Sequence, residues 1–123
     1  MTPEGRARLV LVVDDDVMIR RLVRAVLETD EFEVTEARDG PAALRLADET
    51  DPAVVVLDVM MPGIDGVEVC RQLDHEKMKV VVLTAQDDPS LESEAKAAGA
   101  NAFITKPFSA IELLDLVAEL MPA

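Results

Sequence analysis

The sequence contains few of the residues on which several classes of site depend. It has one cysteine, Cys70, which excludes an internal disulfide and suits a reducing compartment such as the cytoplasm. It has one histidine, His75, and no second histidine accompanies it to complete a zinc site. We therefore interpret Cys70 as a small core residue, and His75, at the polar end of a helix, as a solvated or helix C-terminal residue.

Long apolar runs and positive charge are also scarce. The first apolar run, Leu9–Val13, stops at three aspartates and is too short for a signal peptide or a membrane span. Asp and Glu number 25 against 12 Lys and Arg, which gives a net charge of −13 at pH 7. Such a surface repels nucleic acids and anionic membranes and attracts cations. We therefore expect a cytoplasmic protein that binds neither nucleic acids nor membranes directly. Its length predicts a single domain over residues 1–123.

Five short apolar runs predict an α/β fold with a parallel sheet. The runs are rich in Val and Leu and are separated by helix-like segments, a pattern typical of strands buried on both faces. The predicted strands are Leu9–Val13, Phe32–Glu36, Ala53–Leu57, Val80–Leu83 and Ala102–Thr105. The predicted helices run from Asp16 to about Thr29, over Pro41–Glu49 and Val67–His75, from about Pro89 to Gly99, and from Ser109 to about Met121. The arrangement is (βα)5.

The first predicted helix has an apolar stripe that we expect to face the core. Ile19, Leu22, Val23 and Val26 have the spacing of one helical face, and Asp16 precedes them as a capping residue.

Four of the five strands end on polar residues that suit phosphoryl chemistry. The first ends at Asp14, Asp15 and Asp16, the third at Asp58, the fourth at Thr84 and the fifth at Lys106. Because the carboxyl ends of parallel strands meet at one edge of an open sheet, these groups should converge.

The converging groups predict a magnesium site beside a nucleophile. Carboxylate oxygens are the hard ligands that Mg²⁺ prefers, and a divalent cation together with Lys106 offsets the repulsion between clustered anions. One aspartate can then attack phosphorus, while Thr84 and Lys106 hold the phosphoryl oxygens.

These motifs resemble those of a response-regulator receiver domain of two-component signalling. "LVVDDD", "VVVLDVMMPGIDG", "VVVLTA" and "AGANAFITKPF" occur in that family's order and spacing between Leu9 and about Met121. The resemblance implies a doubly wound, flavodoxin-like sheet of order 2-1-3-4-5. It implies that Asp58 takes a phosphoryl group from the phosphohistidine of a histidine kinase or phosphotransfer protein, and that Lys106-Pro107 is a cis peptide. It also implies Mg²⁺ ligation by Asp14, Asp15, Asp58 and the Met60 carbonyl.

The same resemblance implies a conformational switch and an output surface. On phosphorylation the Thr84 hydroxyl is expected to move toward the phosphoryl group and Phe103 to turn inward. Phe103 has no hydroxyl, unlike the tyrosine often found at this position in the family. A face formed by Leu91, Phe103, Thr105, Ile111 and Leu114 is expected to carry a phosphorylation-dependent homodimer or a target protein.

Two other functions remain open from the residues. Asp14-Asp15-Asp16-Val17 also fits the start of a haloacid-dehalogenase-type phosphatase, with Asp14 as nucleophile and Asp16 as acid, although no cap domain or later acidic pair is present. A phosphate-independent binding module that keeps only the receiver fold is the second alternative, and the intact set of acids disfavours it.

Overall fold

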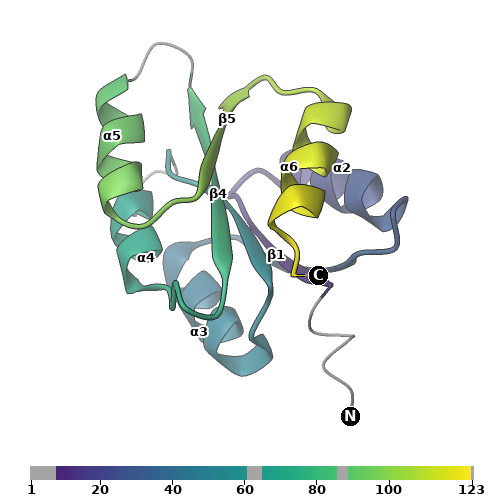
Figure 1. The fold of residues 1–123 in the computed structure, drawn as a ribbon, viewed down its shortest axis with the longest axis horizontal. Coiled ribbons are helices and arrows are strands. Elements are labelled where there is room, and N and C mark those ends of the chain that lie inside the picture. Colours follow the sequence, from purple (N-terminus) through teal and green to yellow (C-terminus); the bar gives the residue numbers. More distant parts are fainter. Residues whose placement is uncertain (1–7, 61–64, 86–88, 123) are drawn as a thin grey trace.

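The fold is a five-stranded parallel sheet covered by helices on both faces (Figure 1). We describe it from a computed structural model, which defines residues 8–60, 65–85 and 89–122. The strands are β1 (Leu9–Val13), β2 (Glu33–Ala37), β3 (Val54–Asp58), β4 (Lys79–Ala85) and β5 (Ala102–Lys106). Their order in the sheet is β2-β1-β3-β4-β5, and every neighbouring pair is parallel. The expected 2-1-3-4-5 order is confirmed.

Five helices alternate with these strands. They are α2 (Val17–Glu28), α3 (Gly40–Thr50), α4 (Gly66–Gln72), α5 (Pro89–Ala97) and α6 (Ala110–Leu120). Helices α2 and α6 cover one face of the sheet, and α3, α4 and α5 cover the other (Figure 1). Alternate residues of each central strand point into the two resulting cores, which explains why the interior positions of these strands are apolar.

Short polar side chains begin most of these helices. Asp16, Asp39, Asp65 and Ser109 each accept a hydrogen bond from a backbone N–H in the first turn of the helix that follows. Because an N-cap oxygen satisfies donors that the helix itself leaves free, these residues fix where each helix starts relative to its strand.

The predicted boundaries hold within two residues except at the end of α4, and the differences at α4 and β4 have physical causes. Helix α4 ends at Gln72, three residues before the predicted end, and Leu73 turns to an extended conformation. Strand β4 continues through Thr84 to Ala85 because β5 pairs with it there, with Thr84 opposite Thr105. The predicted loop after Asp58 lies partly outside the described residues, at 61–64.

The inward face of α2 differs from the prediction at Leu22, which is 47% exposed. Val23 and Leu27 are fully buried, and Ile19 packs partly against the same core. A step of 100° per residue places Leu22 farthest from the Val23–Leu27 line, so it lies on the flank of the helix.

His75 lies just beyond the C-terminal end of α4, as expected, but it is half-buried and not fully solvated. Its Nε2 lies 2.6 Å from the carbonyl oxygen of Cys70, which requires a proton on Nε2. Its ring also fills the space beside Gly99, the residue with φ of +111° that follows α5. Cys70 itself is a buried core residue, as expected, and burial raises its pKa to about 11.

Candidate functional site

Three carboxylates meet at the carboxyl edge of the sheet, on the adjacent strands β1 and β3. Asp14 directly follows β1, and Asp58 is the last residue of β3. Asp14 and Asp58 are buried, whereas Asp15 is exposed. One oxygen from each of these three side chains can be chosen so that all lie within 4.8 Å of one another. The convergence that the strand ends predict is therefore present for these three carboxylates.

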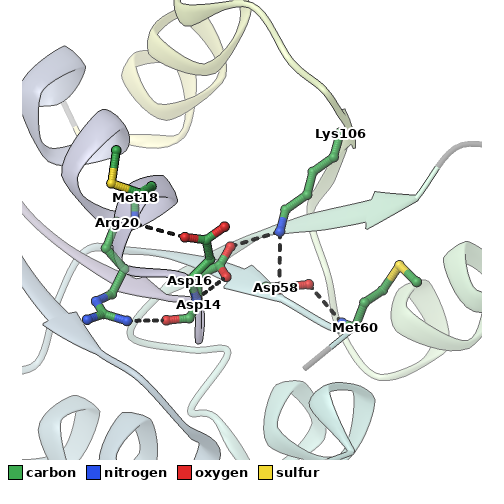
Figure 2. A network of polar contacts seen from close by, with 7 residues as sticks. All are labelled: Asp14, Asp16, Met18, Arg20, Asp58, Met60 and Lys106. Carbon is green, nitrogen blue, oxygen red and sulfur yellow. Dashed lines mark hydrogen bonds and ion pairs between the residues drawn. The ribbon is translucent and has the colours of Figure 1, made fainter. Parts of the chain in front are cut away.

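Lys106 lies between the two buried carboxylates (Figure 2). Its Nζ is 2.9 Å from Asp14 Oδ2 and 3.2 Å from Asp58 Oδ2. Burial raises the pKa of Asp14, although hydrogen bonds from the Asp16 N–H and Lys106 act in the opposite direction. Burial alone lowers the pKa of Lys106, but the hydrogen bond to Asp14 and the charges of both carboxylates outweigh it, so the net pKa is raised. The ammonium group therefore stays charged between its two partners.

Backbone groups hold both buried aspartates in place. The Asp16 N–H donates to Asp14 Oδ1 at 3.0 Å, and the Met60 N–H donates to Asp58 Oδ1 at 2.8 Å. Figure 2 also shows the Arg20 guanidinium donating to the Asp14 carbonyl oxygen, at 2.7 Å. Nothing in the sequence pattern indicates this role for Arg20, because an arginine one turn into an amphipathic helix is ordinarily a solvated residue.

Thr84 and Phe103 lie on neighbouring strands and on one face of the sheet. Thr84 is buried and pairs with Thr105, while Phe103 pairs with Val82, two residues before Thr84. Because side chains alternate along a strand, Val82 and Thr84 point to the same side. Phe103 is partly buried against the core on that side.

The donor set fits a hard divalent cation. Carboxylate oxygens are the only ligand atoms that Asp14, Asp15 and Asp58 supply, and two of these groups are already desolvated. Such a set matches Mg²⁺ better than a metal that prefers nitrogen or sulfur. The Lys106-Pro107 bond beside this site is cis, which confirms that expectation.

The remaining predicted residues come from α5, β5 and α6, and β5 is an edge strand of the sheet. Ile111 is 73% exposed, whereas Leu91, Phe103, Thr105 and Leu114 are half-buried. Within the described part of the chain, no helix has the length and apolar character needed to cross a membrane.

Comparison with known proteins identifies the family to which this fold and site belong. Residues 10–118 match the model of the response regulator receiver domain. The transcriptional regulatory protein ResD of Bacillus subtilis (strain 168) is 39% identical over 113 residues, which cover 91% of this chain and 47% of ResD. The chain thus spans about half the length of the curated relatives it matches.

Solved structures show the same architecture. The chemotaxis protein CheY4 of Vibrio cholerae is 32% identical with a TM-score of 0.84, and the match covers 91% of this chain and 97% of CheY4. A response regulator of Chloroflexus aurantiacus J-10-fl is 34% identical with a TM-score of 0.85, covering 93% of this chain and 97% of that one. The acidic triad is typical of the Mg²⁺ site of such domains. With this fold, this acid cluster and a family match over most of its length, the chain belongs to the response regulator receiver domains, which are signalling phosphoacceptors and not true enzymes.

Proposed function

We propose that Asp58 accepts a phosphoryl group from the phosphohistidine of a histidine kinase or phosphotransfer protein. The observation that carries this proposal is the position of Asp58, whose carboxylate contacts the Lys106 ammonium and lies close to the carboxylates of Asp14 and Asp15. In this arrangement a cation faces the group that would gain a phosphoryl dianion. We further propose that residues 1–123 act as one receiver domain, in the cytoplasm.

The proposed transfer forms one bond and breaks one bond. A carboxylate oxygen of Asp58 attacks phosphorus, and the P–N bond of the phosphohistidine breaks. The bonding electron pair leaves with the imidazole nitrogen, and the product on this chain is an acyl phosphate. Lys106 then pairs with a phosphoryl oxygen, and the Thr84 hydroxyl donates to another.

Asp14, Asp15, Asp58 and the Met60 carbonyl would hold Mg²⁺ at this site. The bound ion would supply charge neutralisation for the carboxylates and the incoming phosphoryl oxygens. Among the three carboxylates, Asp15 is the one that solvent reaches directly, since Asp14 and Asp58 are buried.

Phosphorylation would be read out through Thr84 and Phe103. A new anion at Asp58 draws the Thr84 hydroxyl toward it, and Phe103, on the same face of the sheet, turns into the space that is released. The affected surface is the face formed by Leu91, Phe103, Thr105, Ile111 and Leu114.

Labelling with a small phosphodonor tests the nucleophile. With acetyl phosphate and Mg²⁺, the wild-type chain should gain one phosphoryl group by intact-mass measurement, and Asp58→Asn should gain none. Label that persists in Asp58→Asn and disappears in Asp14→Asn would instead support the phosphatase alternative. Absence of label in the folded wild type would support a phosphate-independent module.

Sedimentation tests the output surface. Beryllofluoride, a phosphoryl mimic, should shift the wild-type chain toward a dimer, and Ile111→Glu should remain monomeric because it places a charge in an apolar contact. Met18→Glu, at an exposed apolar residue on α2, is the matched control and should still dimerise. Assembly that survives in Ile111→Glu would place the interface elsewhere.

A further inference from the structure

Arg20 connects the acidic site to two other elements of the fold. From α2, its Nη1 donates to the Asp14 carbonyl oxygen at 2.7 Å, and its Nε donates to Glu36 Oε1 on β2 at 3.0 Å. The side chain is 15% exposed, so the guanidinium is held in a defined position. We infer that Arg20 is a positioning residue for the metal ligands, which it controls through the Asp14–Asp15 peptide. This inference rests on the proposed function of the site.

The carbonyl that Arg20 holds belongs to the peptide linking the two acidic residues. A peptide unit is planar, so fixing its oxygen fixes the plane from which the Asp15 Cα departs. The other groups of Asp14 are held as well, because its N–H donates to the Ala37 carbonyl at 3.2 Å and its carboxylate accepts from Asp16 and Lys106. Asp14 is therefore fixed by several contacts.

Asp15 depends on this peptide more than Asp14 does. Its carboxylate is exposed and makes no hydrogen bond within the described residues. Its direction toward the other two carboxylates is therefore set mainly by its own backbone. Loss of the Arg20 contact would free the Asp14 carbonyl, and the Asp14–Asp15 peptide could rotate away from the geometry that gathers the three acids.

Glu36 keeps Arg20 in position. One oxygen of Glu36 accepts from Arg20, and the other accepts from Arg24 Nε at 2.6 Å. Burial raises the pKa of Glu36, but the two arginines outweigh that effect and the net pKa is lowered. Glu36 is thus an ionised acceptor at neutral pH. By binding Nε of Arg20, it orients the guanidinium so that Nη1 points toward the end of β1.

The test is the affinity for Mg²⁺ itself, measured by a ¹H–¹⁵N NMR titration, since the chain has no Trp or Tyr to report binding by fluorescence. Outer-shell changes typically weaken metal binding by about 10- to 100-fold, and Arg20→Met should fall near the lower end, at about tenfold. Arg20→Lys should recover part of the affinity, because its ammonium can still donate to the Asp14 carbonyl.

Arg24→Met is the matched control. It lies on the same helix and removes the second donor to Glu36, but Arg24 has no contact with Asp14 among the described hydrogen bonds. It should lower the thermal midpoint of unfolding while leaving the Mg²⁺ dissociation constant within about twofold of wild type, because the contacts of Arg20 with Glu36 and with the Asp14 carbonyl both remain.

Wild-type affinity in Arg20→Met, or an equal loss in Arg24→Met, would overturn the inference and leave the proposed phosphoacceptor function intact. If Arg20→Met does not fold, Arg20→Gln carries the same expectation, since a neutral amide is compatible with a half-buried site but too short to span both partners. A folded wild type that binds no Mg²⁺ would contradict the proposed function itself.

Discussion

Two buried carboxylates, Asp14 and Asp58, share the single ammonium group of Lys106. Replacing Lys106 with Met should therefore destabilise the metal-free protein. Removing one partner of a buried ion pair costs about 3–5 kcal/mol, and we expect about 2 kcal/mol here because Lys106 is 29% exposed and water screens part of the interaction. Urea denaturation in the presence of a chelator measures this loss.

A surface lysine provides the comparison for Lys106. Lys77 is 60% exposed, and its Nζ lies 3.8 Å from Asp51 Oδ1. Lys77→Met should change the free energy of unfolding by less than about 1 kcal/mol, as exposed pairs do. If Lys106→Met and Lys77→Met lower the free energy of unfolding equally, the buried ion pairs of Lys106 stabilise the protein no more than an exposed pair does.

At the scale of one element, the end of α5 depends on a glycine and on a histidine from another part of the chain. Gly99 has φ of +111°, and a Cβ placed on it would lie 2.6 Å from the His75 ring. Gly99→Ala should therefore cost about 3 kcal/mol, combining backbone strain with displacement of the ring. Chemical denaturation of the variant measures this cost.

A double-mutant cycle separates these two contributions. In a His75→Ala background the steric conflict is absent, so Gly99→Ala should cost only the backbone term, about 1–2 kcal/mol. If the two substitutions are simply additive, the ring and the glycine do not interact, and the close packing described here is wrong.

At the scale of the whole molecule, the net charge of −13 opposes compaction. Raising ionic strength from about 0.01 M to 0.15 M shortens the screening length from about 30 Å to 8 Å. We expect the thermal midpoint of the metal-free protein to rise over this range, as measured by circular dichroism. KCl and tetramethylammonium chloride should act alike, because screening depends on ionic strength. A midpoint that salt leaves unchanged would contradict this account.

The sequence by itself determined the succession of strands and helices along the chain and most of the acidic site. Strands β1, β3, β4 and β5 each contain an apolar run, and the polar residues that follow it, as at Asp58 and Lys106, mark the carboxyl edge. Parallel pairing then brings those ends together, so Asp14, Asp58 and Lys106 could be grouped from linear order alone. Local capping residues such as Ser109 likewise fixed a helix start without any distant contact.

Only the tertiary structure decided the features that depend on residues far apart in the chain. Helical periodicity identifies the apolar face of α2 but not which edge of that face packs against the sheet. Leu22 is therefore predicted to be buried, but in the structure it is exposed. The place of the half-buried His75 ring depends on the space that Gly99 leaves. The role of Arg20 depends on contacts of its guanidinium with Asp14, at the end of β1, and with Glu36 on β2. A side chain's own neighbours in sequence carry no record of such contacts, because they arise when separate elements pack together.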